Sequence, residues 1–299
     1  MFYYASKTHN SLNGEEYRPE SVHPGLCVNP YYPVKVYDGA RFMIDSGAFQ
    51  DVGEDTRLTF EDALKRQLDY EKTLTPDGRP AYAIVSYDRL VDEQFNGVAQ
   101  IKERVSYAKS DPYIVDTINA SRFLAERRAE LRPRKLILSC QGTTTDQYIY
   151  CLKEVLKVAQ PGDIIGFGGF CIISKSKEYE RQFYEVINQA FPLIAEAGIN
   201  QAHIFGVGIM RVLIQAEVLA QRYSISLSYD TSSYEVNAIM GRVFDPLNGQ
   251  ITGVFHKGQK KNGYIPARLA YFNIRIIKQF WDNLATMPIQ TDFIAGCSD

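Results

Sequence analysis

Three aspartates in this 299-residue sequence stand at the ends of apolar runs. The runs are RFMID (41–45), AYAIVSYD (81–88) and SISLSYD (224–230). A carboxylate that ends a buried strand is either a turn-forming residue or a catalytic group. As catalytic groups, Asp45, Asp88 and Asp230 could transfer protons or attack an electrophilic carbon.

Further apolar runs end in an amide or in glycines. Gln141 ends KLILSCQ and can both donate and accept hydrogen bonds. Gly168 and Gly169 end DIIGFGG and permit a close approach to the backbone, while Phe49 and Phe205 offer flat apolar faces. If these groups share one pocket with the aspartates, the pocket would suit a planar heterocycle with donors and acceptors on its edge.

The elements that would position these residues alternate along the chain. Short, nearly continuous apolar runs are typical of parallel strands buried on both faces. They occur at 41–45, 81–88, 135–141, 163–169, 202–208 and 224–230, with further possible strands at 2–6 and 251–255. Amphipathic helical patterns separate them, one of them with Thr59 and Asp62 as a helix cap. This alternation predicts an α/β protein.

Two α/β architectures fit the pattern, a (β/α)8 barrel and an open doubly wound sheet. Polar or glycine residues end nearly every strand. In a barrel all those ends converge on one mouth, whereas in an open sheet only the ends near the switch point meet. The sequence therefore favours a (β/α)8 TIM barrel. No linker divides the chain, so we expect a single domain over 1–299, with a helical insertion beside the mouth at about 89–134.

Composition limits the partners that the chain can attract. Apolar residues make up 45% and charged residues 23%, and the net charge of -2 gives no global basic field for nucleic acid. A polynucleotide would therefore have to meet a local patch. The dense basic run at 256–268 is usually a solvated loop, but it offers phosphate contacts through Lys257, Lys260, Lys261 and Arg268.

The five cysteines are scattered, without a C-x-x-C pair, so the sequence predicts neither a zinc cluster nor a redox pair. The N-terminus lacks the pattern of a signal peptide, and no apolar run is long enough to cross a bilayer. These features predict a cytoplasmic protein without a metal site or a membrane partner.

Five motifs, in order over about 190 residues, resemble one known family, the tRNA-guanine transglycosylases. DSGAFQ at 45–50 resembles its D-S-G-G-F/Y-Q signature, and CQG at 140–142 is similar to its V-Q-G. The other three are IIGFGGF at 164–170, similar to I-G-G-L; HIFGVG at 203–208, similar to Y-L-M-G-V-G; and SYDTSSYE at 228–235, similar to D-S-x-S-Y.

The resemblance implies a (β/α)8 barrel that exchanges guanine in a polynucleotide for a 7-deazaguanine without ATP. It implies that Asp230 is the nucleophile that attacks C1′, forming a covalent glycosyl-enzyme, and that Asp45 is the general acid/base. The residues that it implies for binding the base are Asp88, Gln141, Gly168, Gly169, Ser46, Phe49, Phe205 and Phe170.

The sequence departs from the family's tRNA enzymes in two places. The C-x-C-x-x-C…H zinc site is missing, since the C-terminal region holds only Cys297 and His256. Ser174 stands where bacterial members carry a glutamate. A short, zinc-free, single-barrel chain looks most like the phage-type branch that acts on DNA. The expected partners are therefore DNA and a preQ0-type 7-deazaguanine, in the host cytoplasm.

Other interpretations stay open. The same chemistry could act on tRNA, the barrel could be a catalytically inactive nucleic-acid-binding protein, or two acids could serve a glycoside hydrolase. Plainer roles exist for single residues as well. Asp45 could form a turn, Asp230 could cap a helix near Ser233, and Phe49 and Phe205 could belong to the core.

Overall fold

The structure is a computed structural model. It describes residues 1–6, 25–32, 34, 36, 40–51, 57–75, 78–94, 101–104, 107–171, 173, 176–247, 249–254 and 266–286. Three of the four predicted phosphate contacts, Lys257, Lys260 and Lys261, lie outside the described residues.

Eight parallel strands close into a barrel, which confirms the predicted (β/α)8 TIM barrel. Their order around the barrel follows the chain, and the ring closes where the last of them pairs with the first. The strands are β1 (Phe2–Ser6), β2 (Gly25–Val28), β3 (Arg41–Ile44), β4 (Ala83–Val85), β7 (Lys135–Cys140), β8 (Ile164–Phe167), β9 (Gln201–Ile204) and β10 (Ser226–Thr231).

The barrel strands differ from the sequence prediction at two places. The sequence predicts no strand at β2, because its four residues, GLCV, are too short for an apolar pattern to stand out. The possible strand at 251–255 is wrong as a member of the barrel. Its first three residues form β12 (Ile251–Gly253), which pairs antiparallel with β11 (Arg242–Phe244) in a separate two-stranded sheet.

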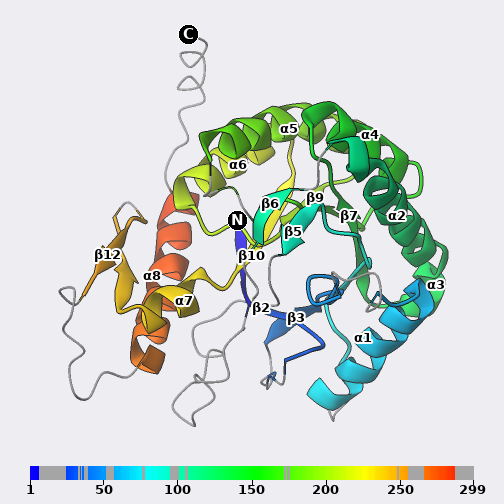
Figure 1. Cartoon of the computed structure of the whole chain (residues 1–299). Coiled ribbons are helices and arrows are strands. Elements are labelled where there is room, and N and C mark those ends of the chain that lie inside the picture. Colours follow the sequence, from blue (N-terminus) through cyan, green and yellow to red (C-terminus); the bar gives the residue numbers. More distant parts are fainter. Residues whose placement is uncertain are drawn as a thin grey trace.

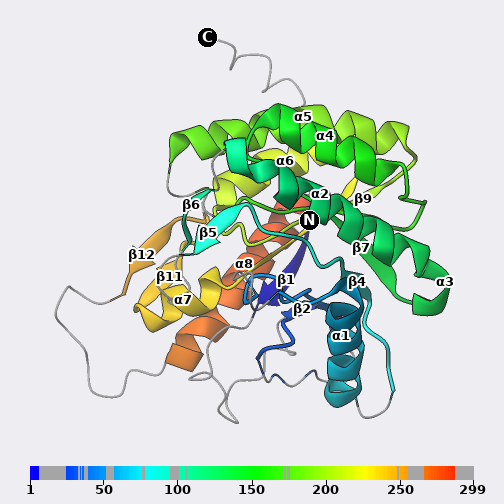
Figure 2. The same ribbon diagram turned by 45° about the vertical axis from the view of Figure 1, so that its right-hand side comes forward.

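The helices surround the strands, and α1, α2, α4, α5 and α6 form an arc outside the barrel (Figure 1). In the turned view α7 and α8 lie beside the β11–β12 hairpin (Figure 2). As predicted, Thr59 caps the first helix, where its hydroxyl accepts from the Asp62 N–H at 3.1 Å. The helices are α1 (Phe60–Leu74), α2 (Tyr107–Glu126), α3 (Arg128–Leu131), α4 (Thr145–Leu156), α5 (Lys177–Glu196), α6 (Met210–Arg222), α7 (Ser233–Ile239) and α8 (Pro266–Thr286).

The predicted helical insertion at 89–134 is only partly helical. Its first half contains β5 (Asp92–Gln94), paired antiparallel with β6 (Ile101–Arg104). The two strands satisfy each other's backbone hydrogen bonds, and a local helical pattern in the sequence does not show such pairing. The helix α2 packs on β7 and α4 and is therefore the regular barrel helix between β4 and β7. The β5–β6 hairpin is the added element.

Alternation along the strands separates the barrel interior from its outer wall. Residues such as Tyr4 and Met43 form an inner cluster, while their neighbours Tyr3 and Phe42 pack outward under the helices. Arg41 fills the N-terminal end of the interior, since its guanidinium carbon lies 3.3 Å from the centroid of the Tyr82 ring. The interior is therefore filled at this end, and the polar cavity lies at the opposite end of the barrel.

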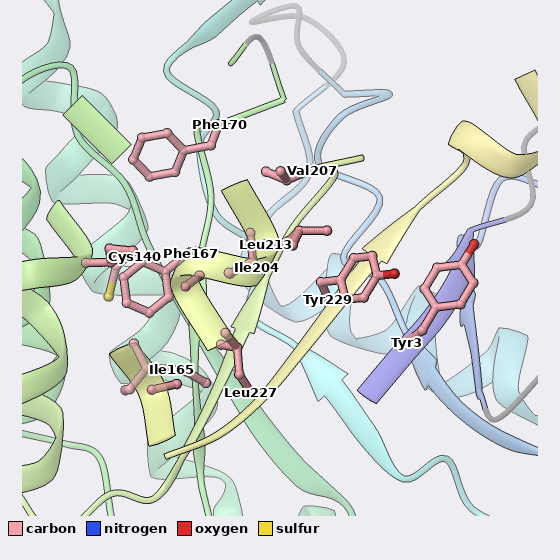
Figure 3. Packing of buried hydrophobic residues seen from close by; sticks show 14 of the residues in the cluster. Tyr3, Cys140, Ile165, Phe167, Phe170, Ile204, Val207, Leu213, Leu227 and Tyr229 are labelled. Carbon is pink, nitrogen blue, oxygen red and sulfur yellow. The ribbon is translucent and has the colours of Figure 1, made fainter. Parts of the chain in front are cut away.

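The outer wall supplies the main hydrophobic core, in which Phe167 of β8 has no solvent exposure (Figure 3). The Phe167 ring stacks on Tyr148 at a centroid distance of 5.9 Å and meets Phe191 edge-on at 5.7 Å. The helices α4 and α5 are thereby held against β8, whose C-terminal end carries Gly168 and Gly169.

We expect Phe167→Ala to lower the free energy of unfolding by about 3–5 kcal/mol, because it leaves a cavity between β8 and its helices. Urea denaturation measures this change. The control is Tyr150→Ala, since Tyr150 is 55% exposed on α4. A Phe167 variant as stable as this control would contradict the packing described.

Candidate active site

A cavity of about 280 Å³ opens at the carboxyl ends of the barrel strands, where barrel enzymes place their sites. Eight of the ten residues predicted for catalysis and base binding line it, although they come from five different strand ends. These eight are Asp45, Ser46, Phe49, Asp88, Gly168, Gly169, Phe205 and Asp230.

Asp45 follows β3 directly and is fixed through both of its carboxylate oxygens. Its Oδ2 accepts a hydrogen bond from Asn29 Nδ2 at 2.8 Å, and its Oδ1 accepts one from the Ser46 N–H at 2.8 Å. Beneath it, Gln67 of α1 donates to the Asp45 carbonyl at 3.1 Å and to the Val85 carbonyl at 2.9 Å. These bonds tie the ends of β3 and β4 together under the cavity.

Asp230 lies within β10 and is 8% exposed. Its Oδ1 accepts from His203 Nε2 at 3.2 Å and from the Gly206 N–H at 3.1 Å, and its Oδ2 accepts from the Ser6 hydroxyl. Asp230 does not cap α7, because the capping residue of that helix is Ser232. The carboxylate is therefore held by donors from β1 and β9 and faces the cavity.

The electrostatic environment favours the protonated form of two of the carboxyl groups. Burial raises the pKa of Asp45 from 3.8 to about 7, with a further contribution from the charges of Asp230 and Asp88. Burial also raises the pKa of Asp88 to about 6, against the opposing charge of Arg57. A carboxyl group that titrates near neutral pH can serve as a general acid and then as a general base.

Gln141 lies behind Asp88 and not on the cavity wall. It is fully buried, its Nε2 donates to Asp88 Oδ2, and its Oε1 accepts from the Val91 N–H at 3.0 Å. Both ends of the amide are therefore occupied. The sequence predicts that Gln141 binds the edge of the base. In the structure Gln141 instead orients the Asp88 side chain.

Aromatic and glycine residues form the remaining walls. Phe49 and Phe205 are both partly exposed and line the cavity, and Phe205 also packs against the inner cluster. Gly166 makes room for Phe205, since a Cβ atom at position 166 would lie 2.6 Å from that ring. Gly169 has a φ of +75°, a backbone conformation that favours glycine.

Two other predicted contacts are not brought to the cavity. Phe170 has no solvent exposure and packs among Tyr148 and Phe183 in the core between β8 and its helices (Figure 3). The φ of +75° at Gly169 interrupts the strand alternation that would place Phe170 on the same side as Gly168, and the Phe170 side chain points into the core, so base binding by Phe170 is wrong. Arg268 is exposed on α8 and does not line the cavity.

An ion pair between the partly exposed Arg66 and the buried Asp51 holds the turn that follows Asp45. Arg66 of α1 donates to the Ser46 carbonyl at 2.7 Å and to Asp51 Oδ2 at 3.0 Å. Asp51 also accepts from the Tyr87 hydroxyl at 2.8 Å and is 3% exposed. Gly47 turns the chain with a φ of +76°, and a Cβ atom there would lie 2.6 Å from the Arg66 guanidinium. This packing fixes Phe49 at the cavity.

Three residues that hydrogen-bond to the aspartates, Ser6, Asn29 and His203, are absent from the sequence prediction, and so is Cys27, which lines the same cavity. Ser6 lies on β1, Cys27 lies on β2 with Asn29 directly after it, and His203 lies on β9. Period-two alternation is the signal that could have found them, because it places Ser6 with Tyr4 and His203 with Phe205 inside the barrel.

Burial, with the nearby Asp230 and Asp45, raises the pKa of the Cys27 thiol well above its usual range.

Within the described part of the chain, no cluster of three or more His, Cys, Asp or Glu side chains could hold a metal ion. No helix among these residues is long and apolar enough to cross a membrane.

Comparisons with known proteins add no identity. No family model matches the chain, and no curated protein matches it. The resemblance in the sequence motifs therefore stays a prediction, to be argued from the site.

The raised pKa of Asp45 predicts how stability depends on pH. Between about pH 4 and 7 the unfolded chain ionises at this residue while the folded chain keeps the proton, so stability falls across this window and levels off above it. We expect Asp45→Asn to remove this cost and to unfold at a higher urea concentration than the wild type at pH 8. The gain should be up to about 4 kcal/mol, since the pKa rises from 3.8 to about 7 and one pKa unit corresponds to about 1.4 kcal/mol.

The comparison needs both a second pH and a control. At pH 4 the two folded proteins should differ little in stability, since the side chain at position 45 is then uncharged in both. Asp282→Asn, at an exposed ion pair on α8, should match the wild type within about 0.5 kcal/mol at both pH values. A gain for Asp45→Asn that was equal at pH 4 and pH 8 would refute burial of this charge.

Proposed function

We propose that this protein is a DNA guanine transglycosylase that exchanges guanine in DNA for a 7-deazaguanine base. The observation that carries the proposal is the different setting of two carboxyl groups at one cavity. Asp45 has a pKa raised to about 7, whereas Asp230 accepts hydrogen bonds from His203, Gly206 and Ser6. Two carboxyl groups in contrasting environments suit an acid/base and a nucleophile.

The proposed reaction is a double displacement. In the first step Asp230 attacks C1′, the bond from C1′ to N9 breaks, and guanine leaves with the electron pair and a proton from Asp45. In the second step Asp45 takes the N9 proton of the incoming base, whose nitrogen attacks C1′, and the electron pair of the ester bond returns to Asp230. This sequence parallels that of retaining glycosidases, in which two carboxyl groups flank the scissile bond.

The cavity has features that would bind a purine-like ring. Phe49 and Phe205 offer apolar faces, and Asp88, with Gln141 behind it, offers a carboxyl group for the N–H groups of a guanine edge. Gly168 and Gly169 line the cavity without side chains, so a ring can approach their backbone closely. About 280 Å³ lies near the lower end of small-molecule pockets, which suits one base better than an oligosaccharide.

The polymer is the part of the proposal that rests on the sequence alone. The motifs resemble the base-exchange machinery, while the zinc motif of the tRNA enzymes is missing from the sequence. A cavity inside a barrel mouth also requires that the target nucleotide be flipped out of a duplex or presented in a single strand, because C1′ and the base edge are otherwise covered.

We expect Asp230→Ala to abolish exchange of radiolabelled guanine into DNA while leaving the fold intact. The loss should exceed about 1,000-fold, because no other group would form the covalent intermediate. The assay follows label in the polymer, and circular dichroism checks the fold. Asp282→Asn is the control, since it removes a carboxylate that is exposed on α8, and it should retain wild-type activity.

DNA and tRNA offered side by side decide the polymer. The proposal predicts label in DNA, while incorporation only into tRNA would keep the chemistry and overturn the choice of DNA. An Asp230→Ala variant that exchanged guanine at the wild-type rate would refute the nucleophile. Failure of the wild type with both polymers would favour an inactive nucleic-acid-binding barrel.

A further inference from the structure

His203 occupies a position under Asp230 that the proposed reaction does not yet use. It is fully buried, and both of its ring nitrogens have partners. The Nε2 atom lies 3.2 Å from Asp230 Oδ1, and the Nδ1 atom lies 2.9 Å from the hydroxyl of Ser228, its partner on β10. Such a site constrains the ring at both ends.

The partners determine which ring nitrogen carries a proton. An ionised Asp230 has only acceptors, so a hydrogen bond to it requires a proton on Nε2. The Ser228 hydroxyl can satisfy Nδ1 in either state. It can donate to a bare Nδ1, or it can accept from a protonated one while it donates to the Ala202 carbonyl at 3.2 Å. His203 can therefore donate to Asp230 whatever its own charge.

The two oxygens of Asp230 are held differently. Oδ1 has two N–H donors, from the His203 ring and from the Gly206 backbone, whereas Oδ2 has the rotatable hydroxyl of Ser6. An oxygen that forms an ester bond becomes a poor acceptor, while the other oxygen becomes a carbonyl that still accepts. The donors thus favour Oδ2 as the attacking atom and Oδ1 as the carbonyl oxygen.

We propose that His203 is a positioning residue for the nucleophile: with the Gly206 N–H it fixes Oδ1 and directs Oδ2 at C1′. This inference rests on the proposed function. In the first displacement the bond from Oδ2 to C1′ forms as the C1′–N9 bond breaks, with guanine taking the electron pair and the Asp45 proton. In the second, the Oδ2–C1′ bond breaks, and the charge that returns to the carboxylate is stabilised at Oδ1 by the same two donors.

Other groups around this pair complete its setting. Tyr4 of β1 meets the His203 ring edge-on at a centroid distance of 5.8 Å, and Phe205 meets it at 4.6 Å. Cys27 and Asp45 lie on the cavity side, and burial raises the pKa of the Tyr4 and Cys27 side chains, so both stay uncharged near neutral pH. Among the described residues, no lysine or arginine forms an ion pair with Asp230.

Two substitutions of His203 distinguish its role as a hydrogen-bond donor from its role as a ring that fills space. His203→Phe keeps a flat ring without an N–H, and His203→Gln keeps a side-chain N–H that can reach Asp230. We expect His203→Phe to slow both formation and breakdown of the covalent intermediate by about 10- to 100-fold, with KM for the free base changed less than about twofold. His203→Gln should recover most of the rate.

A control and a contradicting outcome follow from the same kinetics. Tyr82→Phe removes a hydroxyl that donates to Gln201 at 3.1 Å at the opposite end of the barrel, and it should behave as the wild type. Wild-type rates in His203→Phe, or equal defects in the Phe and Gln variants, would overturn the positioning role.

A second measurement does not depend on any activity. In protein labelled with ¹⁵N-histidine, the His203 signals are those that disappear in His203→Gln, among the four histidines of the chain. The inference predicts a proton on Nε2 at neutral pH. A bare Nε2 with the proton on Nδ1 would overturn it even if base exchange occurs, while a protonated Nε2 in an inactive protein would reject the proposed function and keep the donor geometry.

Discussion

Burial of like charges at the mouth of a closed barrel is the constraint on which the site depends. Asp45, Asp88 and Asp230 line one cavity that is walled by β-strands, and water cannot solvate three carboxylates there as it would at the surface. The cost appears in the raised pKa of Asp45 and Asp88. A group that holds its proton at neutral pH is available to a reaction, so the same burial that costs stability provides the chemistry.

The surrounding residues make this arrangement sustainable. Asn29 and the Ser46 N–H hold Asp45, Gln141 holds Asp88, and donors from β1 and β9 hold Asp230. Behind them, Gln67 joins the ends of β3 and β4, and the Arg66–Asp51 pair fixes the turn that carries Phe49. Gln141, Gln67, Arg66 and Asp51 do not line the cavity. Their role is to fix the orientation of groups that can meet a substrate, which a rigid barrel does better than a loop.

Much of the fold and about half of the site's contacts follow from the sequence. Buried parallel strands have continuous apolar runs, so the sequence predicts strands at RFMI and KLILSC, and the polar residues that follow them, Asp45 and Gln141, predict a common mouth. GLCV is too short to be recognised, and Asn29 after it was missed with the strand. Phe170 fails because the left-handed conformation of Gly169 interrupts the alternation of β8 and directs the next side chain into the core. Contacts between distant segments, such as His203 with Asp230, depend on strand order and register, which no local pattern contains.

The covalent step is the central claim, and mapping the attached residue tests it most directly. The protein would be mixed with a guanine-containing DNA oligonucleotide, quenched under denaturing conditions, digested and sequenced by tandem mass spectrometry. Attachment of the abasic oligonucleotide to Asp230 is the predicted result. Attachment to Asp45, Asp88 or the exposed Cys171, or base exchange that leaves no adduct on the protein, would contradict it.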